Sequence, residues 1–169
     1  MELLKKVFKS TFFVIALFCI IGVVVAQAQF AFFGHPLKGK PAPDFTLDTL
    51  NGSQNLAQVR QGQKAILFFW ATWCPHCREQ LQELDSRKGE FKSKNIEIVL
   101  VDLAESEQLV RQYMKKENIR FNVFLDRNST VTEQYGVYGV PTYFFVDEQG
   151  VVQTVEHFLP EDYEKFFKS

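Results

Sequence analysis

The chain has 169 residues, enough for one ordinary domain with a short extension and too few for two domains. Hydrophobic residues make up 46% and charged residues 23% of the chain, a globular composition that excludes a disordered chain and a coiled coil. The formal net charge is −1 and the basic residues are scattered, so the long-range attraction that nucleic-acid binding needs is missing.

Residues 1–28 differ in composition from the rest of the chain. Three lysines precede an uncharged stretch at 10–26, and Ala-Gln-Ala at 26–28 offers the small residues that a signal peptidase accepts. We expect a targeting segment that exports the domain and leaves its positive end in the cytoplasm. The apolar stretch is longer than most signal cores and shorter than the roughly 20 residues that span a bilayer, so a cleaved signal peptide and a retained membrane anchor both remain open.

Residues 29–43 are rich in Gly and Pro and predict a linker, followed by one domain over 44–169. Hydrophobic periodicity predicts the elements in chain order. The first half has a hairpin from 45 around an Asn-Gly turn at 51–52, a helical stretch at 56–60, a central strand at 65–70, a helix that runs to about 94 and a strand at 96–101. The second half has a helix at 105–116, a strand at 121–125, helical turns at 130–135, paired strands at 143–147 and 151–155, and a helix at 160–167. Strands that alternate with helices and end in an antiparallel pair predict an α/β fold, a mixed sheet with helices on both faces.

The cysteines are used unevenly. Cys19 lies in the apolar N-terminal segment and is expected to be inert, which leaves Cys74 and Cys77 as the one pair in the exported part. Two cysteines three positions apart close a loop too small to stabilise a domain appreciably. The pair is therefore predicted to act chemically.

Cys74 lies between a predicted buried strand and a predicted helix. A helix N-terminus stabilises an anion, and the thiolate is the form of cysteine that attacks disulfides. Pro75 suits the first helical turn, and His76 adds a donor, and a cation when protonated, close to either sulfur. Cys77, one turn further along, is the expected resolving thiol.

Metal sites and haem sites also use two cysteines at this spacing. Zinc would need a second ligand pair, and covalent haem attachment would need a histidine where Arg78 stands. A small copper or zinc site made of both cysteines and His76, with His35 or His157, remains open as the basis of a metal carrier. The leading interpretation is redox chemistry that needs neither a metal nor another cofactor.

The sequence resembles the exported TlpA/ResA-like branch of the thioredoxin superfamily over about residues 40–167. Three segments carry the resemblance: PAPDFTL at 41–47, FWATWCPHCRE at 69–79 and YGVYGVPT at 135–142. The resemblance implies a thioredoxin-like fold with an N-terminal hairpin and a helix-strand insertion after the motif helix. It implies a protein-disulfide oxidoreductase in the periplasm or at the cell exterior, either free or anchored in the inner membrane.

The same resemblance implies the partners and the substrate site. The partners would be exported cysteine-containing proteins, apocytochrome c during cytochrome c maturation among them, and a membrane redox protein. Pro141 would be a cis-proline beside the dithiol, with the backbone of Val140 exposed for pairing with a substrate segment. Trp73 and Pro75 would line that substrate site. An ordinary trans proline that starts an edge strand is the alternative for Pro141.

Two departures from the family pattern concern the proton acceptor of Cys77. Thioredoxin-like reductases commonly carry a buried acid six residues before the first cysteine, where this chain has Phe68. ResA-like reductases carry a glutamate three residues after the second cysteine, where this chain has Gln80, with Glu79 one position early. No acceptor is identified by sequence, and Glu79 is a weak candidate that could instead be a surface residue.

A third departure concerns the direction of electron flow. Pro75-His76 is the dipeptide of the strongly oxidising DsbA-type enzymes, whereas the family resemblance implies a reductant, so direction stays undecided. A thiol peroxidase is a further alternative because peroxiredoxins share the PAPDF opening. Peroxiredoxins need a threonine three residues before the reactive cysteine, and Ala71 holds that position.

Overall fold

The computed structural model describes residues 34–167. The fold described below is that of the compact unit that begins at Leu37. The predicted targeting segment at 1–28 and the first part of the predicted linker lie outside the described residues. Within residues 34–167, no helix is both long enough and apolar enough to cross a membrane.

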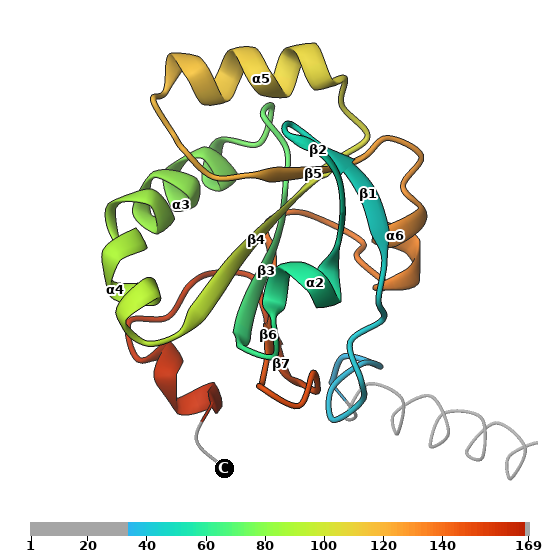
Figure 1. Cartoon of the computed structure of the whole chain (residues 1–169), viewed down its shortest axis with the longest axis vertical. Coiled ribbons are helices and arrows are strands. Elements are labelled where there is room, and N and C mark those ends of the chain that lie inside the picture. The colour runs from blue at the N-terminus through green and yellow to red at the C-terminus, as the bar shows by residue number, and fades with distance from the viewer. Residues whose placement is uncertain (1–33, 168–169) are drawn as a thin grey trace, which may run out of the picture. The chain divides into compact units, whose positions relative to one another are not determined.

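Seven strands and their helices alternate along the chain (Figure 1). In chain order they are β1 (Thr46–Thr49), β2 (Gly52–Asn55), α2 (Leu56–Arg60), β3 (Lys64–Trp70), α3 (Pro75–Ser86), α4 (Lys88–Ser93), β4 (Ile96–Leu103), α5 (Glu107–Lys116), β5 (Val123–Asp126), α6 (Thr130–Gln134), β6 (Thr142–Val146), β7 (Val152–Glu156) and the 3₁₀ helix η1 (Tyr163–Phe167).

The strands form one mixed sheet in the order β2-β1-β5-β4-β3-β6-β7. β3, β4 and β5 are parallel neighbours, whereas β6 pairs antiparallel with β3 and with β7, and β1 pairs antiparallel with β2 and with β5. The predicted mixed sheet with an N-terminal hairpin and a central helix-strand insertion is therefore confirmed.

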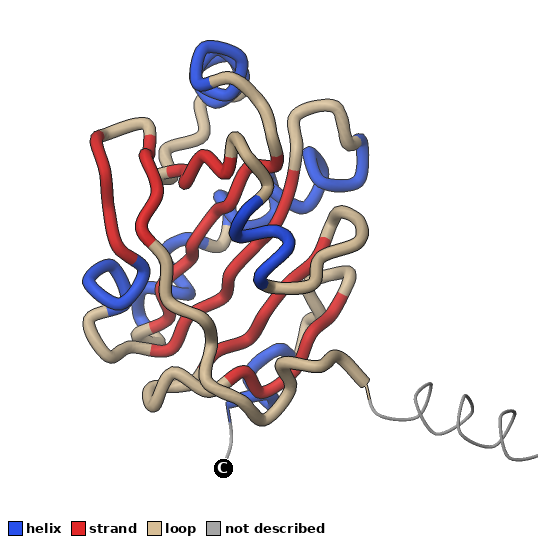
Figure 2. Tube along the Cα trace, turned by 90° about the vertical axis from the view of Figure 1, so that its right-hand side faces the viewer, coloured by secondary structure: helices blue, strands red, loops and turns tan. Residues whose placement is uncertain are grey.

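Helices cover both faces of the sheet (Figure 2). The buried side chains form two core clusters. Helices α3, α4, α5 and η1 contribute to one cluster, and α2 and α6 contribute to the other. Along β3, side chains alternate between the clusters, so that Phe68 and Trp70 face the α3 side while Leu67 and Phe69 face the α6 side. β3 is buried on both faces, which explains its uninterrupted apolar run.

Two helix predictions differ from the structure. The single helix expected to run to about residue 94 is divided into α3 and α4 at Arg87, whose backbone leaves the helical region at φ −98° and ψ 7°. The Arg87 guanidinium binds Glu83 and Glu90, one on each side of the break, and lies over the ring of Tyr163. The final helix is the short η1, which starts three residues later than expected.

Candidate active site

The first cysteine caps the helix that carries the second. β3 ends at Trp70, a short turn follows, and Cys74 is the N-cap residue of α3, with Pro75 in the first turn. The Sγ of Cys74 accepts a hydrogen bond from the backbone N–H of Cys77 at 3.2 Å. The sulfur therefore occupies the position where a helix N-terminus stabilises an anion.

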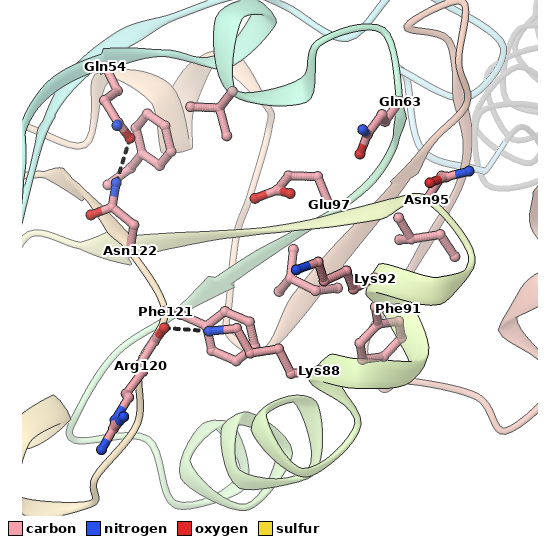
Figure 3. A pocket seen from close by; sticks show the side chains of 14 residues that line it. Gln54, Gln63, Lys88, Phe91, Lys92, Asn95, Glu97, Arg120, Phe121 and Asn122 are labelled. Atoms are coloured by element: carbon pink, nitrogen blue, oxygen red, sulfur yellow. Dashed lines mark hydrogen bonds between the residues drawn. The ribbon is translucent and has the colours of Figure 1, made fainter.

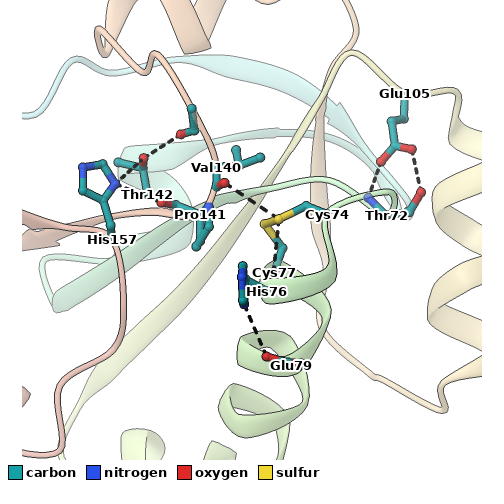
Figure 4. Close-up of a disulfide and its surroundings, with 11 residues drawn as sticks. Thr72, Cys74, His76, Cys77, Glu79, Glu105, Val140, Pro141, Thr142 and His157 are labelled. Atoms are coloured by element: carbon teal, nitrogen blue, oxygen red, sulfur yellow. Dashed lines mark hydrogen bonds and ion pairs between the residues drawn. A yellow bond between two sulfur atoms is a disulfide. The ribbon is translucent and has the colours of Figure 1, made fainter.

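The two cysteines form a disulfide, with their Cα atoms 5.2 Å apart (Figure 4). Cys74 is 5% exposed and Cys77 is fully buried. An incoming thiolate can therefore reach only the Cys74 sulfur. This asymmetry matches the predicted division into an attacking cysteine and a resolving cysteine.

The loop between α6 and β6 reaches the dithiol. The Val140–Pro141 peptide bond is cis, as the family resemblance implied. The carbonyl oxygen of Val140 lies 3.8 Å from the Sγ of Cys74. The backbone of Val140 is therefore next to the reactive sulfur, where a bound substrate segment would pass.

His157 is exposed to solvent and contacts this loop from the end of β7 (Figure 4). Its Nδ1 lies 3.0 Å from the carbonyl oxygen of Pro141 and 3.3 Å from Oγ1 of Thr142. The Thr142 hydroxyl donates to the carbonyl of Gly139 at 2.7 Å. Because a carbonyl oxygen only accepts, a hydrogen bond at this contact requires Nδ1 to donate to Pro141.

His76 faces the solvent. Its side chain is 80% exposed, and its Nδ1 lies 3.5 Å from Oε2 of Glu79, which is 76% exposed. An ion pair this exposed contributes about 0–1 kcal/mol. Glu79 is thus a surface residue that pairs with His76, and it is too exposed to serve as a buried proton acceptor for Cys77.

The position of the family's buried acid is apolar. Phe68 is fully buried and stacks on Tyr143 with their ring centroids 4.4 Å apart. The other family position holds the neutral amide of Gln80. Burial raises the pKa of Tyr143 far above its usual range, so its phenol stays neutral at physiological pH. Neither family position therefore supplies a carboxylate near Cys77.

A buried acidic pair lies beyond the active-site turn, and sequence reasoning missed it. Glu105 accepts hydrogen bonds from the backbone N–H and from the hydroxyl of Thr72, each at 2.6 Å (Figure 4). The backbone N–H of Glu105 donates to Oδ1 of Asp102 at 3.3 Å. The available signal was an aspartate at the carboxyl end of a predicted central strand, next to the strand that leads into Cys74.

Three exposed aromatic side chains are sequence neighbours of residues in this site. Trp73, which precedes Cys74, is 66% exposed, and Tyr138 in the loop before Pro141 is fully exposed. Phe158, which follows His157, is also exposed. Large exposed apolar groups near a reactive centre are typical of a surface that binds another protein.

A cavity lies away from the dithiol residues. It has a volume of about 550 Å³ and includes Lys88, Glu97 and Arg120 in its lining, with none of the dithiol residues (Figure 3). Within residues 34–167, no three His, Cys, Asp or Glu side chains gather as a metal site would require.

Comparisons with known proteins agree with this geometry. The sequence profile of the AhpC/TSA family matches residues 38–155. The chain is 32% identical to the thiol-disulfide oxidoreductase ResA of Bacillus subtilis over 151 residues, which cover 89% of this chain and 84% of ResA. It is 33% identical to the thioredoxin-like protein YneN of the same organism over 121 residues, 70% of each chain.

Solved structures give the same result. A putative thiol:disulfide interchange protein DsbE from Chlorobium tepidum matches with a TM-score of 0.68 and 31% identity, over 76% of this chain and 91% of that one. StoA from Bacillus subtilis matches with a TM-score of 0.63 and 25% identity, over 74% and 96% of the two chains. The expected resemblance to thioredoxin-like, ResA-type proteins is confirmed.

Proposed function

The chain belongs to the AhpC/TSA family, and from that premise we propose that it is a thiol–disulfide oxidoreductase that acts on exported proteins through Cys74 and Cys77. One observation carries the proposal: a helix-capping sulfur that is slightly exposed is bonded to a fully buried one, beside the backbone of Val140. Such an arrangement exposes one sulfur to attack and keeps the second in reserve.

In the oxidising direction, a substrate thiolate attacks Sγ of Cys74. The Cys74–Cys77 bond breaks, a mixed disulfide forms at Cys74, and Cys77 leaves as a thiolate that takes up a proton. The second substrate cysteine, as a thiolate, then attacks the substrate sulfur of the mixed disulfide. Cys74 is released as a thiolate, the substrate is oxidised by two electrons, and the enzyme dithiol is reduced by two. The reducing direction reverses each step.

The potential of the dithiol decides which direction prevails. A more stable Cys74 thiolate favours the reduced enzyme and so makes it a stronger oxidant. The helix N-terminus and the Cys77 N–H supply the stabilisation, typically about 0.3–1 kcal/mol for the helix dipole at exposed sites. His76 adds little because it is exposed and pairs with Glu79. We therefore expect His76→Ala to shift the glutathione equilibrium constant less than tenfold.

The proposed location is extracytoplasmic, with residues 1–28 acting as a signal peptide or an inner-membrane anchor. The lysine-then-apolar pattern of that segment and the names of the ResA and DsbE relatives support this location. The proposed partners are exported cysteine-containing proteins such as apocytochrome c, together with a membrane redox protein. A fusion of the full chain to a phosphatase that is active only after export would be inactive if the location is wrong.

Trapping variants test the activity. Cys77→Ser removes the resolving thiol, so the full-length protein should accumulate mixed disulfides with a reducible client such as insulin. Cys74→Ser should form none and should lose reductase turnover. Equal turnover of Cys74→Ser and the unchanged protein would refute the proposal, and so would failure of the unchanged protein to form a reversible disulfide in glutathione buffers.

A further inference from the structure

Two carboxyl side chains are buried where β4 ends. Asp102 is fully buried and Glu105 is 8% exposed. Within residues 34–167, neither carboxyl forms an ion pair with Lys, Arg or His. Buried carboxylates without a cation are costly, and the thiol–disulfide exchange described above does not use these two. Their presence therefore calls for a physical role.

Glu105 holds the turn that leads into the dithiol. Both oxygens of its carboxyl accept hydrogen bonds from Thr72, one from the backbone and one from the hydroxyl. Thr72 lies two residues before Cys74, and the N–H of Cys74 closes the turn onto the carbonyl of Ala71 at 3.2 Å. The position of the Cys74 sulfur is thus linked to Glu105 through a three-residue turn.

Asp102 faces the same side of the sheet as the dithiol. Asp102 is in register with Trp70 on the neighbouring strand β3. Trp70 and Leu100, two residues before Asp102 on β4, belong to the core cluster that contains both cysteines. Because side chains alternate along a strand, Asp102 points toward that cluster and the α3 face.

The two carboxyls lie in one buried site, and the Glu105 backbone N–H donates to Oδ1 of Asp102. Adjacent carboxylates in a buried site disfavour each other's ionisation. The Glu105 carboxyl accepts two hydrogen bonds from Thr72, whereas Oδ2 of Asp102 is buried without a hydrogen-bond partner among the described residues. Burial first, and then the Glu105 carboxyl, raise the pKa of Asp102 to about 8.

The other groups around Asp102 do not offset the negative charge that it gains when it loses its proton. From the end of β5, Asp126 adds a further like charge to its surroundings, although it is engaged in capping α6. On the neighbouring strand β3, Asp102 is in register with the uncharged Trp70. At neutral pH Asp102 is thus mostly protonated, and above about pH 8 it adds a negative charge to this face of the sheet.

We propose that Asp102 and Glu105 form a buried pair that positions Cys74 through Thr72 and makes the redox equilibrium of the dithiol depend on the charge of Asp102. The inference rests on the proposed thiol–disulfide exchange. Both residues are positioning residues, because neither contacts the reacting sulfur. Glu105 acts through its hydrogen bonds to the turn at Thr72, and Asp102 acts through its electrostatic field on the dithiol face of the sheet. Loss of the Asp102 proton adds a negative charge that disfavours the Cys74 thiolate and therefore favours the disulfide.

The direct test is the glutathione equilibrium of the full-length protein between pH 6 and pH 9. At the alkaline end, Asp102→Asn cannot acquire the negative charge that Asp102 gains, so its disulfide should be about three- to tenfold less favoured than in the unchanged protein. At the acidic end, the two proteins should agree. The thiolate absorbance of Cys74 should lose the inflection near pH 8 in the same variant.

Glu97→Gln is the matched control. Glu97 lies on the same strand, and burial raises the pKa of its carboxyl too, but it lines the cavity remote from the dithiol residues. Its equilibrium curve should follow that of the unchanged protein. If Asp102→Asn also follows that curve, the inference is wrong while the proposed function stands. If the unchanged protein forms no reversible disulfide, the proposed function itself fails.

Thr72 supplies an independent test that leaves both acids in place. Thr72→Val keeps the shape of the side chain and removes the hydroxyl that donates to Glu105. Thr72→Val should change the glutathione equilibrium constant at neutral pH about threefold or more. Thr72→Ser keeps the hydroxyl, so its equilibrium constant should stay close to that of the unchanged protein. Equal constants for the valine and serine variants would overturn the link between Glu105 and Cys74.

Discussion

Replacing Asp102 with Asn should stabilise the folded protein at neutral pH. The amide keeps the size of the carboxyl and cannot ionise, so it imitates the protonated acid that the buried site prefers. The folded state binds this proton more tightly than the unfolded state does. The contribution of Asp102 to stability is therefore complete below about pH 4 and is lost as the pH rises through about 8.

The magnitude follows from the two pKa values. The pKa of Asp is about 3.9 in the unfolded chain and about 8 for Asp102 in the folded protein. Each pH unit between these two values changes the free energy of unfolding by about 1.36 kcal/mol. At pH 7 the upper limit is about 4 kcal/mol. A measured gain of about 2–4 kcal/mol is expected, falling to about zero near pH 4.

Urea unfolding of the disulfide-bonded protein and of Asp102→Asn at several pH values between 4 and 8 measures this difference. The free-energy difference should grow steadily with pH while the denaturant slope stays the same in both proteins. A variant that is less stable than the unchanged protein at pH 7, or a difference independent of pH, would show that Asp102 is held as a carboxylate and refute the reasoning.

Three further predictions concern other residues. His157→Ala removes the donor to the Pro141 carbonyl and should slow reduction of a protein disulfide about three- to tenfold with an unchanged glutathione equilibrium; an unchanged rate would contradict it. Trp73→Ala should weaken client binding, measured as a raised KM, without changing the unfolding midpoint, because its side chain is exposed. Glu90→Gln should cost about 1 kcal/mol near neutral pH in urea unfolding, since Glu90 binds Arg87, Lys94 and Tyr163. Those contacts lower the pKa of Glu90 to about 2, so this cost should shrink as the pH falls from about 4 toward 2, the opposite trend to Asp102→Asn.

Local features of the sequence account for the part of the site that lies within one segment. The strand, turn and helix around Cys74 are contiguous, and each is specified by its own pattern: an uninterrupted apolar run, a capping residue and a proline in the first turn. The burial difference between Cys74 and Cys77 follows from one turn of helix. Such predictions need no knowledge of which strands pair.

Periodicity alone did not place the break at Arg87. The apolar positions continue across α3 and α4, and the break depends on a side chain that binds Glu83 and Glu90 and lies over a ring from the C-terminal η1. The contact with Tyr163 crosses more than 70 residues of chain. The hydrophobic pattern within one segment carries no information about a contact with a residue so distant in the sequence.

By itself, the sequence determined the mixed sheet, the cysteine pair next to a helix N-terminus, the cis-proline through its family motif and the difference in burial between Cys74 and Cys77. Only the tertiary structure decided what surrounds the pair: Glu105 beneath Thr72, Asp102 on the dithiol face, and His157 behind Pro141. The physical reason is that these residues lie far apart in the sequence. Propensity and hydrophobic period act over a few residues, whereas these contacts join residues from different strands and loops, and strand order and register bring them together.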